Sequence, residues 1–298
     1  MTIGIIGNTS KSEIGKAVIA IAGHIRSAGM KYLISEKLKP YTGSYLAAED
    51  FAPSAVLCVA ADIIFSVGGD GTMLTTAYTV IPYGKPVLGI NFGNLGFLAE
   101  AELDQLESVL QAIRQNRVSV EERTVLSAVS SQEGGDILLA VNDLVVNRGG
   151  YPRMIEMTIK VNEHYVTTFS ADGIIIATPT GSTGYSLSTG GPVVVPDAKV
   201  IALSPISPHS LNMRHLILHE DSVITVKVSS HPSTVQVSSD GQRVSDFLPP
   251  MELLIRRYEK NLRIMRPGTA GYFEILRSKL SWGLDARKKR RDEPDNGD

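Results

Sequence analysis

At 298 residues the chain is longer than a typical single domain, and its 43% hydrophobic and 20% charged residues allow it to bury a sizeable core. The formal net charge of -2 gives no general basic field for nucleic acid or an anionic membrane, so an anionic ligand has to be held locally. A single cysteine, Cys58, excludes an intrachain disulfide and a cysteine-rich metal site, and without a signal-peptide pattern or a membrane-spanning apolar stretch we expect a cytoplasmic protein.

Short apolar runs alternate with longer helical segments up to about residue 116. The runs "IGIIG", "KYLIS", "DIIFSV" and "KPVLGIN" predict strands. Residues 12–29 and 104–114 have apolar side chains at helical spacing. Strands that alternate with helices indicate a mostly parallel sheet covered on both faces. We therefore expect an α/β domain over residues 1–118.

The rest of the chain has a different pattern of short β-type runs separated by Gly, Pro, Ser, Asn and Asp. Examples are "TVLSAVS", "DILLAVNDLVVN", "MIEMTIKV", "GIIIAT" and "SVITVKVS". This pattern predicts an all-β domain of packed antiparallel strands over residues 119–270. Residues 271–284 have helical spacing and predict a C-terminal helix, and the charged residues 285–298 predict a disordered tail.

The stretch "GGDGT", residues 68–72, places Asp70 among glycines directly after a predicted strand. Ligands of parallel sheets bind beyond the carboxyl ends of the strands. No P-loop lysine follows the glycines, and the dinucleotide G-x-G-x-x-G pattern fails because Leu74 stands at its third position. A carboxylate beside phosphate oxygens is repulsive unless it holds a metal or accepts a proton. Asp70 is therefore a candidate base or metal anchor, and a locally bonded turn remains the alternative.

Two later stretches add polar chemistry. "VND" places Asn142 and Asp143 within apolar β-type sequence. An amide can pair with an adenine edge, and a carboxylate can accept hydrogen bonds from a ribose diol. An edge turn is the alternative for this pair. "ADGIIIATPTGSTGYSLSTGGPVV" combines hydroxyls, glycines and Tyr185, which can stack on a base, although a plain surface loop has the same composition.

Taken together, these motifs resemble the NAD kinase family, whose members phosphorylate the 2′-hydroxyl on the adenosine ribose of NAD to give NADP. The resemblance covers nearly the whole chain to about Trp282 and is carried by "GGDGT", "VND", "TPTGSTGYSLSTGGP", "SPISPHSLNMRHLIL" and "SSDGQ", in the family's order. The fold that the resemblance implies is an α/β domain followed by an all-β domain.

The resemblance also implies roles for individual residues. Asp70 would accept the proton, with Gly71 beside the substrate, while Asn142 and Asp143 would hold the adenosine. The remaining residues of the implied dinucleotide site are Arg153, Ser170, Asp172, Thr183, Gly184, Tyr185, Ser186, Leu187, Ser188 and Gln242. Family members often have Glu in place of Asp143 and Ala in place of Gly184, so this chain has a shorter carboxylate and a looser loop there.

The sequence thus predicts a NAD kinase that uses ATP or polyphosphate. We expect Mg²⁺ or a similar divalent ion to be held on the donor phosphates and not in a permanent protein site. Exposed sheet edges and the family resemblance predict a homodimer or homotetramer with sites shared between subunits. A related "GGDG" lipid or sugar kinase and a non-catalytic dinucleotide-binding regulator remain the alternatives.

Overall fold

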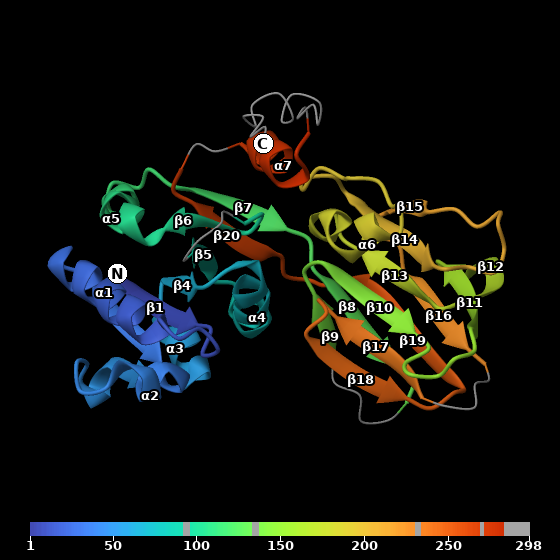
Figure 1. Cartoon of the computed structure of the whole chain (residues 1–298), viewed down its shortest axis with the longest axis horizontal. Helices are drawn as coiled ribbons and strands as arrows, with labels where there is room; N and C mark the ends of the chain where they lie inside the picture. Colours follow the sequence, from blue (N-terminus) through green and yellow to red (C-terminus); the bar gives the residue numbers. More distant parts are fainter. Residues whose placement is uncertain (92–95, 133–136, 230–233, 269–270, 283–298) are drawn as a thin grey trace, which may run out of the picture.

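The computed structural model describes residues 1–91, 96–132, 137–229, 234–268 and 271–282, and Figure 1 shows two bodies side by side. The first body has a mostly parallel sheet in which β1 is flanked by β2 and β4, β4 pairs with β5, and β20 follows β5. Its strands are β1 (Thr2–Gly7), β2 (Lys31–Ser35), β3 (Phe51–Ala52), β4 (Ile63–Val67), β5 (Pro86–Asn91), β6 (Ala99–Glu102), β7 (Ser119–Arg123) and β20 (Leu262–Arg266).

Helices cover both faces of this sheet. They are α1 (Ile14–Ser27), α2 (Lys39–Thr42), α3 (Ser54–Ala60), α4 (Asp70–Val80) and α5 (Leu106–Arg114). Successive residues of a strand face opposite sides, so Phe65 packs in one core with residues of α1 and α5, while Ile64 packs in another with residues of α3 and α4. Because both of its faces are covered, every residue of β4 is buried, which explains its continuous apolar sequence.

The second body is a sandwich of two antiparallel sheets. One sheet has the order β15-β14-β13-β10-β17-β18, and the other has the order β12-β11-β16-β19-β8-β9. The strands are β8 (Leu126–Ser130), β9 (Leu138–Ala140), β10 (Asp143–Asn147), β11 (Ile155–Val161), β12 (His164–Ala171), β13 (Gly173–Ala177), β14 (Val200–Ile206), β15 (Leu216–His219), β16 (Ile224–Val228), β17 (Val235–Ser239), β18 (Arg243–Phe247) and β19 (Met251–Arg257).

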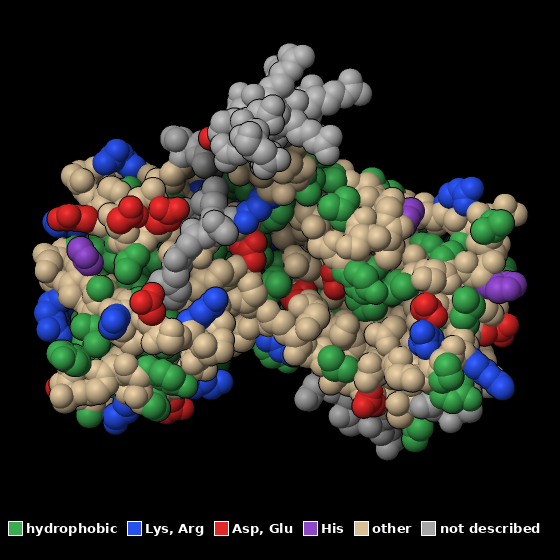
Figure 2. Space-filling model, in the orientation of Figure 1, with side chains coloured by type: hydrophobic (Ala, Val, Ile, Leu, Met, Phe, Trp, Pro, Cys, Tyr) green, Lys and Arg blue, Asp and Glu red, His purple; other side chains and the backbone are tan. Residues whose placement is uncertain are grey.

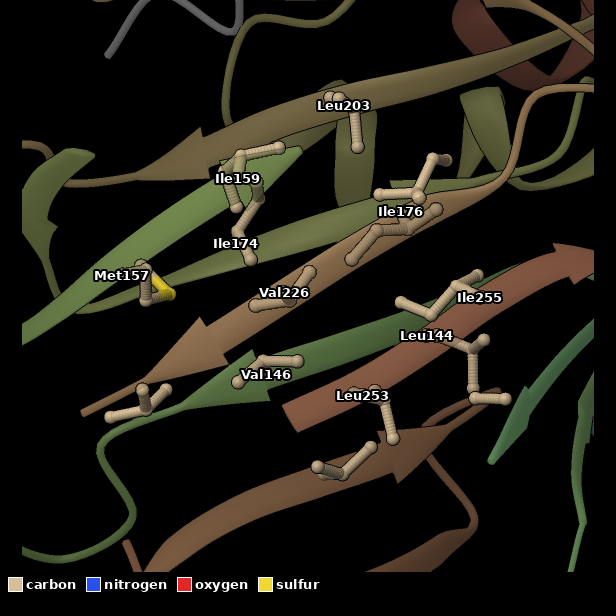
Figure 3. Close-up of a cluster of buried hydrophobic side chains, with 14 of the residues drawn as sticks. Leu144, Val146, Met157, Ile159, Ile174, Ile176, Leu203, Val226, Leu253 and Ile255 are labelled. Carbon is tan, nitrogen blue, oxygen red and sulfur yellow. The ribbon is translucent and has the colours of Figure 1, made fainter. Parts of the chain in front are cut away.

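Alternate residues from the two sheets form one apolar core between them. Figure 3 shows Leu144 and Ile176 from the first sheet with Val226 and Ile255 from the second, all buried. The alternation of apolar and polar residues along β19 places its apolar side chains in this core. Two helices complete the described chain, α6 (Tyr185–Ser188) beside the sandwich and α7 (Tyr272–Leu280) near the C-terminus.

The predicted fold class is confirmed: an α/β body with a mostly parallel sheet, an all-β body and a C-terminal helix. The two bodies do not simply follow one another along the chain. β7 and β20 lie within the predicted all-β span, 119–270, but pair with each other in the first sheet. The predicted tail, 285–298, lies outside the described residues. No helix in the described part of the chain is long and apolar enough to cross a membrane.

Candidate active site

The "GGDGT" turn joins the buried strand β4 to helix α4, and Asp70 is the first residue of that helix. Gly68 has a φ of +150°, and a Cβ there would collide with the side chain of Thr72. The turn therefore needs glycine at this position. Its geometry directs the start of α4, with its free backbone N–H groups, toward the carboxyl ends of the strands.

The carboxylate of Asp70 is held by three backbone N–H groups from one segment. Phe97 N donates to Oδ2 at 2.9 Å, and Leu98 N and Ala99 N donate to Oδ1 at 3.0 and 3.1 Å. An ionised carboxylate has about four acceptor positions, so the described residues leave one position, on Oδ2, for a ligand. A Cβ at Gly96 would collide with this carboxylate, so the glycine allows the segment to approach.

A cavity of about 670 Å³ lies beside the start of α4. It is lined by residues that follow β1 and β2, among them Asn8, Lys11 and Lys37, and by Gly69 and Gly71. The described lining residues include two lysines and no acidic side chain. In contrast, positive and negative side chains are interspersed over the face of the molecule shown in Figure 2. The cavity is therefore suited to a polyanion, although the net charge of the chain is slightly negative.

Asn142 and Asp143 lie at the start of β10, where the carboxylate of Asp240 fixes the backbone. Asn142 N and Asp143 N donate to Oδ1 of Asp240 at 2.7 and 3.2 Å, and Val141 N donates to Oδ2 at 3.0 Å. Asp143 is 5% exposed, and no described residue donates a hydrogen bond to its side chain. Burial, and to a lesser extent the nearby charge of Asp240, raises the pKa of Asp143 to about 7.

The loop 178–191 meets this pair. A Cβ at Gly184 would lie 3.7 Å from Oδ2 of Asp143 and 3.9 Å from Nδ2 of Asn142, so a side chain there would begin to fill the space in front of both groups. Tyr185 is 47% exposed at the start of α6, whereas Ser186 is buried and its Oγ lies 2.9 Å from Oγ of Ser204. The ring of Tyr185 is thus available to a ligand, and the Ser186 hydroxyl supports the loop.

Gln242 connects the sandwich to α4. Its Nε2 donates to the carbonyl oxygen of Gly71 at 2.6 Å, and its Oε1 accepts from the hydroxyl of Thr75 at 2.6 Å. In Figure 1, α4 lies on the side of the first body that faces the sandwich. The structure therefore brings together the predicted site residues of both bodies: Asp70, Gly71, Asn142, Asp143, Thr183 to Ser188 and Gln242.

Three predicted site residues lie elsewhere. In the ladder between β10 and β13, Asp143 pairs with Ala177 while Asn147 pairs with Gly173. Asp172, five residues before Ala177, is therefore about 17 Å away along the strand at 3.4 Å per residue. Its Oδ1 accepts from Nε of Arg148 at 2.7 Å. Ser170, in β12, and Arg153 are at this same far end, so within one copy of the chain they do not join the Asp143 group.

The sequence interpretation did not identify Lys11, Lys37, Thr75 or Asp240 as site residues. Lys11 and Lys37 follow the predicted first and second strands, so the rule that ligands bind beyond the carboxyl ends of strands was the signal for them. Asp240 stands within the quoted "SSDGQ" motif, but its partners are backbone N–H groups about a hundred residues away. No local pattern marks such a contact.

The site combines a carboxylate at the start of a helix with a polyanion cavity and a buried amide and carboxylate pair. This combination is suited to a phosphotransferase with a nucleotide-like substrate. Comparison with known proteins agrees. Residues 3–118 match the ATP-NAD kinase N-terminal domain, and residues 141–266 match the ATP-NAD kinase C-terminal domain. The NAD kinase of Laribacter hongkongensis is 35% identical, over 94% of this chain and 96% of its own.

A further relative supports the same assignment, and two solved structures share the fold. The NAD kinase of Heliobacterium modesticaldum is 41% identical over 74% of this chain and 79% of its own. A yeast NADH kinase complexed with NADH has a TM-score of 0.87 at 24% identity, covering 96% of this chain and 89% of that one. An NAD kinase from Archaeoglobus fulgidus in complex with ATP has a TM-score of 0.74 at 26% identity, covering 94% of this chain and 99% of that one.

The chain belongs to the NAD kinase family and is a phosphotransferase that acts on NAD. The family resemblance predicted from the sequence is thereby confirmed. The two alternatives, a lipid or sugar kinase and a non-catalytic regulator, are not retained.

Replacing Asp143 with Asn tests the burial of its carboxyl group. The folded-state pKa of about 7 lies above the ordinary pKa of 3.8 for aspartate, so the folded protein retains a proton that the unfolded chain releases between these values. The stability of the parent therefore falls as pH rises from about 4 to about 7. A neutral amide avoids this loss, so we expect Asp143→Asn to stabilise the protein more at pH 8 than at pH 5, measured by chemical denaturation.

The matched control is Asp246→Asn, an exposed carboxylate on β18. We expect the stability of this variant to follow that of the parent at both pH values, because its Asp143 is unchanged. A stability gain for Asp143→Asn that is the same at both pH values would contradict the buried, unpartnered state of Asp143.

Proposed function

We propose that the site transfers a phosphoryl group from ATP or polyphosphate to the 2′-hydroxyl of the adenosine ribose of NAD, with Asp70 as the proton acceptor. The observation that carries this proposal is the position of Asp70: it stands between Gly69 and Gly71, which line the polyanion cavity, and Gly71 is hydrogen-bonded to Gln242 in the hairpin turn whose Asp240 holds Asn142 and Asp143. A ribose hydroxyl is a weak nucleophile, and a carboxylate within hydrogen-bond reach both orients it and removes its proton.

The Asn142 and Asp143 pair is the proposed adenosine site. Burying a carboxylate without a hydrogen-bond donor is costly, and a ligand that supplies hydroxyl donors offsets that cost. A ribose diol has this chemistry, and the amide of Asn142 can pair with an adenine edge. The exposed ring of Tyr185 supplies a stacking surface, and the loop residues Thr183, Gly184, Ser186, Leu187 and Ser188 shape its wall.

The phosphate donor is proposed to lie in the 670 Å³ cavity. Lys11 and Lys37 can neutralise phosphate oxygens, and the N-terminus of α4, an 11-residue helix, adds backbone N–H groups and a favourable dipole. The Archaeoglobus fulgidus relative binds ATP and the yeast relative binds NADH, which supports both ligands for this chain. ATP and polyphosphate share the chain of phosphates that this cavity recognises.

Mg²⁺, or a similar divalent ion, is proposed to enter with the donor phosphates. Among the described residues, no three His, Cys, Asp or Glu side chains lie close enough together to hold a metal ion. Oxygens of the donor phosphates and of water would hold the ion, because the open Oδ2 position of Asp70 is assigned to the ribose hydroxyl. When bound, the ion would neutralise charge on the phosphates.

A homo-oligomer, dimer or tetramer, is proposed from the residues left outside the site. Ser170 lies in β12, an edge strand of one sheet, and β15 is an edge strand of the other. Tyr165, in β12, is 65% exposed, and Ile217, in β15, is 43% exposed. Unpaired edges with apolar side chains favour association. We propose that Arg153, Ser170 and Asp172 serve the site of a neighbouring copy. An active monomer at micromolar concentration, found by light scattering, would contradict this.

The cytoplasmic location predicted from the sequence is retained as a proposal, and so is the division into two domains, with β7 and β20 assigned to the first. The lone cysteine, Cys58, is buried, as expected for a small apolar side chain in a reducing compartment.

Replacing Asp70 with Asn tests the proposed proton acceptor. The amide oxygen of Asn can still accept from Leu98 and Ala99, so we expect the fold to persist, but the amide cannot take a proton. We expect kcat for NAD phosphorylation to fall roughly 10²- to 10⁴-fold. NAD binding, measured by calorimetry, should stay within a few fold. A folded variant with near-parental kcat would show that the carboxylate only shapes the turn.

Divalent ions separate the two chemical roles of Asp70. If excess Mg²⁺ or Mn²⁺ restores the activity of Asp70→Asn, the carboxylate is chiefly a metal ligand and the proton acceptor lies elsewhere. If kcat stays low at every metal concentration, the role as a base is supported.

A further inference from the structure

The hairpin turn between β17 and β18, residues 240–243, has a conformation that its sequence specifies. Asp240 and Gly241 have φ values of +52° and +63°, and Gln242 N donates to the carbonyl of Ser239 at 3.0 Å. Positive φ at two successive central residues is the requirement of a type I′ turn, for which Asp-Gly is a preferred sequence. The turn is therefore a short, well-defined element with little freedom to rearrange.

One side of this turn holds the proposed adenosine site. The carboxylate of Asp240 accepts the three backbone N–H groups of Val141, Asn142 and Asp143, and Asp240 N donates to the carbonyl of Asp143 at 2.9 Å. Hydrogen bonds to a charged acceptor are stronger than neutral ones. The direction in which Asn142 and Asp143 present their side chains thus depends on Asp240, which is one residue outside the β17 ladder.

The other side of the turn holds α4 at three positions on one face. Gln242 bonds to Gly71 O and the hydroxyl of Thr75, and the guanidinium of Arg243 lies 3.5 Å from the centre of the Tyr78 ring. Residues 71, 75 and 78 are spaced by four and three, so they share a helix face. Gly71 directly follows Asp70, so the hydrogen bond from Gln242 holds the first turn of the helix that carries the proposed proton acceptor.

We propose that the 240–243 turn sets the spacing between the adenosine site and Asp70, and that Asp240 and Gln242 are positioning residues for phosphoryl transfer. The proposal rests on the proposed function of Asp70, Asn142 and Asp143. The side-chain amide of Gln242 is engaged with α4 through both its nitrogen and its oxygen, so it positions α4 whether or not its remaining donor and acceptor also contact the dinucleotide. A displacement of about 1 Å between reacting groups can lower a rate about 100-fold.

The two positioning residues act on different kinetic constants. Gln242→Ala frees the first turn of α4 and leaves the bonds of Asp240 to residues 141–143 in place. We expect kcat to fall about 10-fold while KM for NAD stays within about twofold, because the substitution removes stabilisation of the transition state and not of bound NAD. Asp240→Asn replaces one acceptor oxygen with an NH₂ group, which cannot accept the hydrogen bond from the backbone N–H group that it faces. We expect KM for NAD to rise about 10-fold because the adenosine site loses its support.

The experiment is steady-state kinetics with NAD, ATP and Mg²⁺ on both variants, the double variant and Asp246→Asn. Asp246 is an exposed carboxylate on β18, so its replacement removes a charge from the same hairpin without touching either body's part of the site. We expect Asp246→Asn to match the parent. If the turn acts as one unit, the losses of kcat/KM in the double variant are smaller than the product of the single losses.

Gln242→Glu provides a second variant should Gln242→Ala unfold. Glu keeps an acceptor for the Thr75 hydroxyl but places an oxygen against the carbonyl of Gly71, so we expect the same loss of kcat. The inference is overturned if the Gln242 variants match Asp246→Asn, if they change KM alone, or if the two losses multiply. A parent enzyme that does not phosphorylate NAD contradicts the proposed function itself, so the two failures are distinguishable.

Discussion

The side-chain amide of Gln242, bonded at once to Gly71 and Thr75, joins the two bodies at the point where the chemistry is proposed. Each body supplies only part of the site. The α/β body contributes a carboxylate and a polyanion cavity, whereas the sandwich contributes a buried amide and carboxylate pair. A phosphoryl acceptor bound to one body and a donor bound to the other react only if the separation between the bodies is fixed. Hydrogen bonds across this contact, together with the apolar core that Leu139 and Val141 share with α4, therefore hold the two binding surfaces in one active site.

The two carboxylates of the site have opposite environments. Asp70 accepts three backbone N–H groups, which fix its orientation, and the described residues leave one of its acceptor positions open. Asp143 is buried beside Asp240, no described residue donates a hydrogen bond to its side chain, and its pKa is raised to about 7. Backbone N–H groups thus orient Asp70 before the ligand binds, whereas the proposed hydrogen-bond donors of Asp143 come from the ligand itself. Such a difference suits a general base and a binding residue, respectively.

Much of this arrangement could be predicted from local sequence. Buried parallel strands have continuous apolar runs, so β4 and the "GGDGT" turn that follows it were placed correctly. The short apolar strand β20 could not be assigned to its sheet, because an alternating pattern shows which face of a strand is buried but not which strand it pairs with. The partners of Asp70 were also hidden, since any residue can supply a backbone N–H group. Asp172 follows the motif order of the family, yet strand register places it at the far end of the β10 and β13 ladder.

A crystal structure with NAD and a non-hydrolysable ATP analogue bound tests most directly whether the two bodies form a single active site. A single active site predicts that the 2′-oxygen of the adenosine ribose lies within hydrogen-bond reach of Oδ2 of Asp70, about 2.6 to 3.2 Å. It also predicts that the adenosine lies on Asn142 and Asp143, and that the analogue's phosphates lie in the cavity beside Lys11 and Lys37. A dinucleotide that occupies the sandwich with its 2′-oxygen out of reach of Asp70, or phosphates bound away from that cavity, would contradict it.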